Sequence, residues 1–182
     1  MKAAIVIGHL AHKGNEAALL RSAEAFGINH VHVIGEREYT YDISQGADQH
    51  VTFFEHDDAD ALCGYLRAEN YTLVAIENTA DAIEVGSGAR YPTNPAFVVG
   101  EEGSGVPDEI LSRAEQVRII PQSPNGYVTC LNTTVAGSIA LFDWYQDCRS
   151  RAGGHLETVS DVSKEKTRRV PLLAAPVEVA DE

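Results

Sequence analysis

Hydrophobic and polar positions follow two different periods along the first 150 residues. Short apolar runs of strand length alternate with segments whose apolar positions recur at helical spacing. The runs predict strands over residues 2–8, 31–34, 51–54, 73–76, 97–100 and 117–120. The periodic segments predict helices over residues 15–26, 58–68, 108–114 and 132–147. This alternation predicts an α/β fold with a mainly parallel sheet flanked by helices.

Several residues in this pattern are typical of positions where helices begin or end. Asn15 is expected to cap the first helix, and Gly27 follows that helix as a stop signal. Pro107 stands at the start of the helix over residues 108–114. Ligands of parallel sheets bind beyond the carboxyl ends of the strands. The loops after Gly100 and after Ile120 are therefore the places where a site is expected.

The pattern changes after residue 149. The following stretch is polar, and residues 171–182 are rich in Ala, Val and Pro without an amphipathic period. We expect one domain over residues 1–150 and a C-terminal tail, partly disordered, over residues 151–182. The basic run at residues 164–169 is interpreted first as part of a solvated tail and second as a contact to RNA.

Composition narrows the class of protein. No apolar run approaches the roughly 18–20 residues of a membrane helix, and the N-terminal run is too short for a secretory signal, so a cytoplasmic protein is expected. The cysteines are scattered and His30 and His32 are expected to flank a strand, which argues against a disulfide framework and a metal site. The net charge of −13 argues against a broad RNA-binding surface, although a local basic patch can oppose it.

Three stretches carry candidate chemistry. Residues 97–110 (FVVGEEGSGVPDEI) run from a strand through a glycine-rich turn into a helix, which fits a nucleotide site or a tight structural turn equally well. Residues 117–142 place a polar loop before a helix that opens with small residues. Residues 14–27 (GNEAALLRSAEAFG) contain Arg21, for which a surface salt bridge with Glu16 or Glu24 is the simpler interpretation when this stretch is taken alone.

Together these stretches resemble the three motifs of the SpoU/TrmH family of the SPOUT superfamily, in the family's order. Residues 15–27 match N-x-G-x-x-x-R-[ST]-A-x-A-F-G with one change, and residues 100–106 match G-x-E-G-x-G-[LV]. Residues 120–136 match I-P-M/Q, a loop, and then S-L-N-[VT]-[ST]-V-A. Residues 44–51 are similar to a further family segment, so the resemblance covers about residues 1–149.

The resemblance implies a deep C-terminal trefoil knot, a rare exception to the unknotted rule, with S-adenosylmethionine (SAM) bound inside it. It also implies homodimers whose active site draws on both subunits, and methyl transfer to a ribose 2′-hydroxyl of RNA. The cofactor-binding residues implied are Val99, Gly100, Glu101, Gly103, Ile119, Ile120, Cys130 and Leu131. The catalytic residues implied are Arg21, Asn15, Glu102 and Asn132.

An arginine normally stays protonated, so Arg21 is expected to orient the hydroxyl and stabilise its developing negative charge. Asn15, Glu102 and Asn132 are expected to hold Arg21, the ribose and the loop in place. The short domain mildly favours tRNA over rRNA.

Two departures from the family pattern keep other interpretations open. Ala17 replaces a usual glycine, and Cys130 replaces a usual serine, whose hydroxyl is the stronger hydrogen-bond partner. A non-catalytic relative that binds SAM or RNA is the main alternative. An enzyme of the same fold acting on a base nitrogen and an unknotted nucleotide-binding domain are further alternatives.

Overall fold

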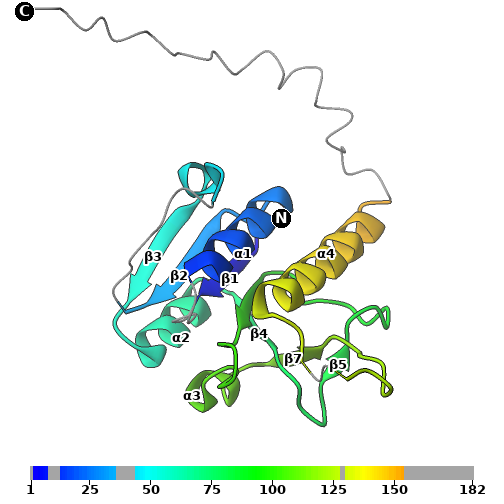
Figure 1. The fold of residues 1–182 in the computed structure, drawn as a ribbon. Coiled ribbons are helices and arrows are strands. Elements are labelled where there is room, and N and C mark those ends of the chain that lie inside the picture. The colour runs from blue at the N-terminus through cyan, green and yellow to red at the C-terminus, as the bar shows by residue number, and fades with distance from the viewer. Residues whose placement is uncertain (1, 8–12, 36–43, 128–129, 154–182) are drawn as a thin grey trace, which may run out of the picture. The chain divides into compact units, whose positions relative to one another are not determined.

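Seven parallel strands form one sheet in the order β3-β2-β1-β6-β4-β7-β5 (Figure 1). The computed structural model describes residues 2–7, 13–35, 44–127 and 130–153. The strands are β1 (Ala4–Ile7), β2 (His30–Ile34), β3 (Thr52–His56), β4 (Thr72–Ile76), β5 (Ile83–Glu84), β6 (Pro95–Val99) and β7 (Gln116–Ile119). The helices are α1 (Lys13–Ala25), the 3-10 helix η2 (Ala47–His50), α2 (Ala59–Ala68), α3 (Asp108–Leu111) and α4 (Thr133–Arg151). The predicted α/β class with a parallel sheet is confirmed.

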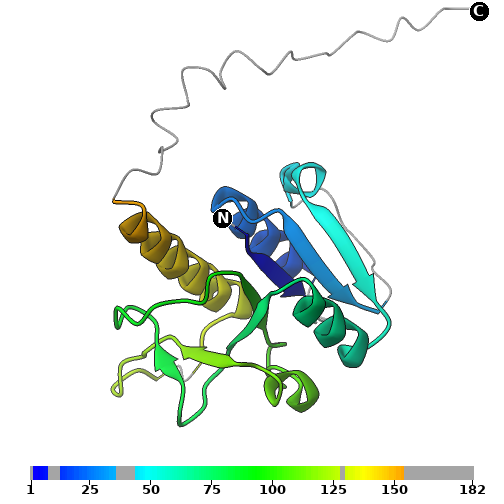
Figure 2. The ribbon, with the colours of Figure 1, turned by 180° about the vertical axis from the view of Figure 1, so that it is seen from behind.

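Helices cover both faces of the sheet because successive strand residues point to opposite sides. Ile5 and Ile7 of β1 pack in one apolar cluster with α1 and α4, whose members include Leu19 and Leu141. The intervening residue Val6 packs in a second cluster, with α2 and α3, on the face that Figure 2 turns toward the viewer. Strands buried on both faces explain the nearly continuous apolar runs of the sequence.

Some helices and strands begin or end at residues other than those predicted. Helix α1 begins at Lys13, so Asn15 lies in its first turn and the predicted N-cap role of Asn15 is wrong. Helix α3 ends at Leu111 rather than at residue 114, with Pro107 as its N-cap residue. Strand β5 was not predicted, because two residues show no period. Asn132 precedes α4 instead of belonging to it.

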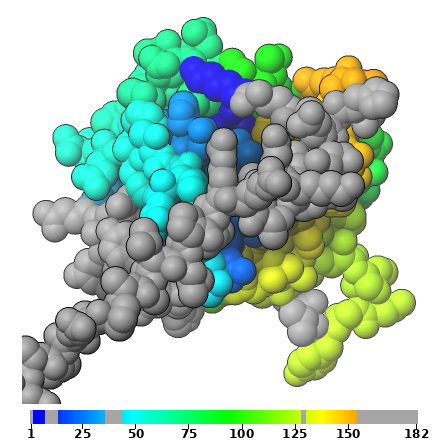
Figure 3. Space-filling view, turned by 90° about the horizontal axis from the view of Figure 1, so that it is seen from above, coloured from blue at the N-terminus to red at the C-terminus, as the bar shows by residue number. Residues whose placement is uncertain are grey.

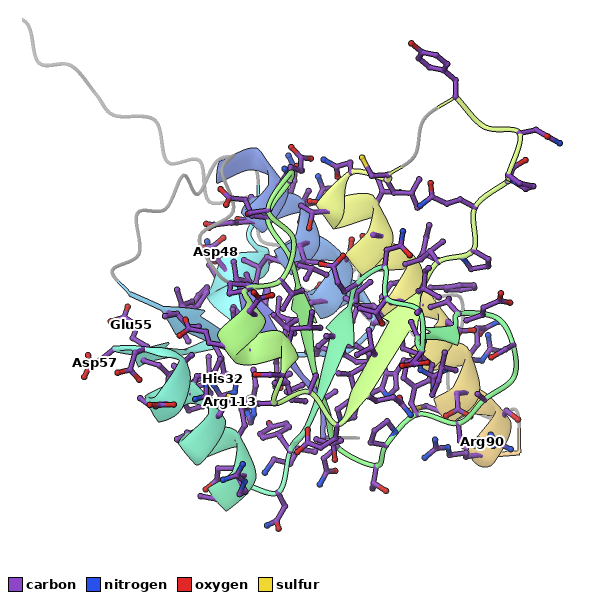
Figure 4. The ribbon with its side chains drawn as sticks, turned by 90° about the horizontal axis from the view of Figure 1, so that it is seen from below. His32, Asp48, Glu55, Asp57, Arg90 and Arg113 are labelled. Carbon is purple, nitrogen blue, oxygen red and sulfur yellow. The ribbon has the colours of Figure 1, made fainter. Side chains whose placement is uncertain are left out.

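The two histidines expected to flank a strand both lie inside β2. His32 is completely buried, and its ring packs against Phe54 of the neighbouring strand and Tyr65 of α2. Along the outer strand β3, Glu55 is exposed and projects from the edge of the sheet (Figure 4). A charged side chain on an edge strand disfavours pairing with another chain.

Strands β6, β4 and β7 are neighbours in the sheet, and all three run in the same direction. Their carboxyl ends therefore meet along one edge, at Val99, Ile76 and Ile119. The segment after β7, residues 121–127, is exposed throughout and projects from the surface in yellow-green in Figure 3. This edge is the one at which the sequence predicted a site.

Contacts within the chain divide it into two units, Met1–Cys148 and Arg149–Glu182. The first unit contains the whole sheet. Of the predicted tail, only residues 151–153 are described, and the basic run at residues 164–169 lies outside the described part. Within that part, no helix is both long enough and apolar enough to cross a membrane.

Candidate active site

A cavity of about 610 Å³ opens at the carboxyl ends of β4, β6 and β7. Its walls come from the ends of these strands, the glycine-rich loop after β6 and the start of α4. The lining residues are Ile76, Glu77, Asn78, Val99, Gly100, Glu101, Glu102, Gly103, Gly105, Arg118, Ile119, Ile120, Gln122, Cys130, Leu131, Asn132, Thr133 and Ala136. All eight residues expected to bind the cofactor are among them.

The glycine loop, residues 100–106, folds back on itself. The backbone N–H of Glu101 donates to the carbonyl of Gly105 at 3.1 Å, and the N–H of Gly105 donates to the carbonyl of Glu101 at 2.9 Å. A Cβ atom at Gly100 would lie 2.2 Å from the carbonyl carbon of Gly105, which no real contact allows. Gly105 itself has a φ of +73°, a conformation that favours glycine. The loop therefore forms this wall of the cavity only with glycine at both positions.

Asn132 joins three parts of the site. Its Oδ1 accepts hydrogen bonds from the backbone N–H groups of Thr134 at 3.0 Å and Val135 at 3.2 Å, and so caps α4. Its Nδ2 donates to Oδ1 of Asn15 at 3.1 Å and to the carboxylate of Glu102. One side chain thus connects the start of α4, the first turn of α1 and the glycine loop.

Two threonines at the start of α4 add further links. The hydroxyl of Thr133 donates to the carbonyl of Gly100, and the hydroxyl of Thr134 donates to the carbonyl of Asn15 at 2.8 Å. Both threonines are buried. The small residues that the sequence showed here let α4 approach the loop and α1 closely. A Cβ at Gly137, for example, would lie 2.8 Å from Cδ1 of Leu19.

Arg21 has a different setting from the other three residues expected to act in catalysis. Glu102 and Asn132 line the cavity, and Asn15 contacts Asn132, but Arg21 is not among the lining residues. Its side chain is exposed. The surface salt bridge that the isolated motif suggested stays a prediction.

Charge in the cavity is mainly negative. Glu77, Glu101 and Glu102 contribute carboxylates, and Arg118 is the only lysine or arginine among those lining residues that the structure describes. Arg118 is completely buried. Its guanidinium packs 4.0 Å from the ring centre of Tyr91, and Nη2 donates to the carbonyl of Arg90 at 2.7 Å. Burial and the neighbouring Asp143 raise the pKa of Tyr91 far above its ordinary value, so the ring faces Arg118 in its neutral form.

The model of the SpoU rRNA Methylase family matches residues 2–142. The chain belongs to this family. Membership agrees with the three motifs.

Related proteins agree with this assignment. This SpoU-family protein is 26% identical over 159 residues to an Escherichia coli (strain K12) protein named tRNA (guanosine(18)-2'-O)-methyltransferase, covering 86% of this chain and 68% of that protein. It is also 26% identical over 149 residues to the mouse tRNA (guanosine(18)-2'-O)-methyltransferase TARBP1, covering 77% of this chain but only 9% of the mouse protein.

Solved structures share the fold. The TrmH/SpoU tRNA modifying enzyme of A. aeolicus superimposes with a TM-score of 0.74 at 20% identity, over 92% of this chain and 86% of that one. The SpoU methyltransferase AviRb of Streptomyces viridochromogenes, in complex with AdoMet, gives a TM-score of 0.70 at 18% identity, over 84% of this chain and 58% of that one. The SpoU-family protein therefore has the SpoU/TrmH fold.

Sequence reasoning missed the wall of the cavity that β4 supplies. Ile76, Glu77 and Asn78 follow one another there, and none belongs to a matched motif. The signal was present, because a strand was predicted over residues 73–76 and its carboxyl end should face a ligand. Only the strand order, with β4 between β6 and β7, identifies these residues as part of this site.

Proposed function

We propose that this SpoU-family protein transfers the methyl group of SAM to a ribose 2′-hydroxyl of RNA, with tRNA favoured over rRNA. The observation that carries the proposal is the cavity beside the glycine loop, at whose rim Asn132 is hydrogen-bonded to Glu102 and Asn15. The names of the relatives, tRNA (guanosine(18)-2'-O)-methyltransferases, support tRNA as the substrate class.

The lining of the cavity fits SAM. Its volume lies within the roughly 300–1,000 Å³ of small-molecule sites. Apolar strand ends, including Val99 and Ile120, offer a surface for the adenosine moiety, and the nearby carboxylates would offset the positive charge of the sulfonium. Bound SAM supplies an electrophilic methyl group. The chain itself then has to position the acceptor and stabilise the oxygen as its proton leaves.

Glu102 and Asn132 would hold the acceptor ribose at the rim, because both line the cavity and are fixed by the hydrogen bond between them. Arg21 would orient the 2′-hydroxyl and stabilise its negative charge, acting as a cation that keeps its own proton. Positioning supplies much of the rate in such a reaction. The proposed reaction requires no metal ion, and its RNA substrate favours a cytoplasmic location.

A homodimer would bring Arg21 to a cavity. Along α4, Val135, Ile139 and Phe142 are 46%, 37% and 50% exposed and are spaced four and three residues apart, so they form one apolar stripe. Helix α1 lies beside α4, where the hydroxyls of Ser22 and Ser138 are 2.7 Å apart. A second copy covering the stripe would therefore lie close to Arg21, as an active site drawing on both subunits requires. The trefoil knot remains a prediction of family membership.

Calorimetry with SAM and S-adenosylhomocysteine, followed by methylation of purified tRNA and rRNA with labelled SAM, tests the proposal. Mass spectrometry of the digested nucleosides would show whether the label is on a ribose or a base. We expect binding of both ligands and a 2′-O-methylated nucleoside from tRNA. Binding without transfer to either RNA would instead establish the non-catalytic alternative, and no binding would refute the assignment of the cavity.

A further inference from the structure

Glu77, a carboxylate outside the matched motifs, connects the walls of the cavity. It follows the last residue of β4 and lines the cavity. Its Oε2 accepts a hydrogen bond from the backbone N–H of Val106 at 2.8 Å, and its Oε1 accepts one from the N–H of Asn78 at 2.8 Å. Its own N–H donates to the carbonyl of Arg118 in β7 at 3.0 Å. A single residue thus touches β4, β7 and the glycine loop.

The contact between Glu77 and the loop is close. A Cβ atom built on Gly105 would lie 2.6 Å from Oε2 of Glu77, so the carboxylate packs directly against the backbone of the loop. Residues 102–104 are exposed, and Gly103 has no side chain with which to pack. The second half of the loop is held by the two backbone hydrogen bonds between Gly105 and Glu101, by the buried side chain of Val106, and by the Glu77 carboxylate that accepts the N–H of Val106.

We propose that Glu77 is a positioning residue for the cofactor. It holds Gly105 and Val106 so that the glycine loop forms one wall of the cavity. Hydrogen bonds to an ionised carboxylate are roughly twice as strong as those between neutral groups, which suits the anchoring of a loop whose tip, residues 102–104, is exposed. The inference rests on the proposed function only for the identity of the ligand, SAM.

The geometry explains why a carboxylate stands at this position. Two backbone N–H groups, from Asn78 and Val106, point at its two oxygens. A glutamine offers one oxygen, and its NH₂ group would face the second N–H, donor against donor. Glu77→Gln should therefore keep one of the two hydrogen bonds and position the loop in part, whereas Glu77→Ala should lose both.

Glu115 provides a matched control. Its Oε2 accepts a hydrogen bond from the backbone N–H of Leu73 at 2.8 Å, at the opposite end of β4. The bond has the same chemistry as the one between Glu77 and Val106, but Glu115 does not line the cavity. Replacing Glu115 with alanine removes one such bond, to a strand, whereas replacing Glu77 removes two, of which one is to the loop. Only the Glu77 substitution should change the cofactor site.

The first test is calorimetry of SAM and S-adenosylhomocysteine with the wild type, Glu77→Gln, Glu77→Ala and Glu115→Ala, alongside urea unfolding of each. We expect the Kd to rise about tenfold in Glu77→Ala, equivalent to about 1.4 kcal/mol, and less in Glu77→Gln. Glu115→Ala should bind as the wild type does even if it loses as much stability. A Kd for Glu77→Ala within about twofold of the wild type, or an equal loss in Glu115→Ala, would overturn the proposal.

Hydrogen exchange of the backbone amides in the free protein is the second test. In Glu77→Ala, the amides of Gly105 and Val106 should exchange faster than in the wild type, whereas Glu115→Ala should leave them unchanged. If these amides exchanged at the wild-type rate in Glu77→Ala, the claim that Glu77 positions the loop would be refuted. If the wild type bound no SAM, the proposed function would fail, but this measurement would still determine whether Glu77 positions the loop.

Discussion

Nδ2 of Asn132 donates a hydrogen bond to Oδ1 of Asn15 at 3.1 Å, although the two residues are 117 positions apart in the sequence. The oxygen of the same Asn132 side chain caps α4 by accepting from Thr134 and Val135. The residue that caps the last helix therefore also attaches it to the first helix. Two of the family's motifs meet in this one contact.

Asn132→Ala should destabilise the protein by about 1–2 kcal/mol, since loss of an asparagine N-cap costs typically about 1 kcal/mol and the bond to Asn15 is lost as well. Asn132→Asp should keep the cap but lose the donation to Asn15, and it would place a second carboxylate beside Glu102. Urea unfolding should therefore rank the wild type above both variants. Wild-type stability in Asn132→Ala would contradict the capping geometry.

Gly100→Ala should disrupt the cavity, because its Cβ would fall on the backbone of Gly105, which cannot move as a flexible side chain could. We expect a loss of SAM binding of at least about tenfold, together with a lower melting temperature. Gly64→Ala in α2 is the control, since a Cβ there meets nothing within 4 Å and alanine favours a helix. That variant should be as stable as the wild type or more so, with unchanged SAM affinity.

His32 should make the stability of the fold depend on pH. Its Nδ1 lies 2.9 Å from Nε2 of His56, its Nε2 is buried without a partner among the described residues, and burial lowers its pKa from 6.5 to about 3. The neighbouring His56 also lowers the pKa of His32. The folded state therefore keeps His32 neutral under conditions in which the unfolded chain is protonated.

Because the unfolded state binds the extra proton, the free energy of unfolding should be unaffected by His32 above pH 6.5. It should fall as the pH drops from 6.5 toward 3, by up to about 1.4 kcal/mol per pH unit for one proton. Urea unfolding at pH 7.5 and pH 5 should show the loss, and His32→Phe should reduce it. His50→Gln is the control, since His50 is exposed. If the free energy of unfolding of His32→Phe fell between pH 7.5 and pH 5 by as much as that of the wild type, other groups would be the cause.

Arg21→Ala should leave SAM affinity unchanged, because Arg21 does not line the cavity of its own chain. Methyl transfer should fall by about 10²–10³, the usual effect of removing one group that stabilises a developing oxyanion. Arg67→Ala, at an exposed position in α2, controls for the loss of surface charge. If Arg21→Ala transferred the methyl group at the wild-type rate, the proposed role of Arg21 would be refuted.

Replacing Ile139 and Phe142 with glutamate should convert a dimer into a monomer, because both side chains lie in the exposed apolar stripe of α4. Light scattering after gel filtration would measure the mass directly. Tyr127→Ser is the control, since Tyr127 is fully exposed and lies outside α4. A wild type that is monomeric at micromolar concentration would refute the homodimer.

Apolar periodicity was sufficient to predict every strand of four or more residues, because strands buried on both faces leave long apolar runs. It could not predict β5, which has two residues, nor the start of α1 at Lys13. Strand order depends on pairing between distant segments, such as β1 with β6, which no local pattern encodes. For the same reason the motifs indicated Gly100 and Leu131 as site residues, but Glu77 could be recognised only after β4 was placed between β6 and β7.

The link between Asn15 and Asn132 also has a consequence for biosynthesis. A nascent chain that has not yet emerged as far as residue 132 can contain the glycine loop and Glu102, but it lacks the wall formed by Asn132, Thr133 and Ala136. Cofactor affinity should thus appear late in translation, when α4 docks. Binding of SAM would then report that synthesis has passed this helix, and a proteolytic fragment without α4 would not bind.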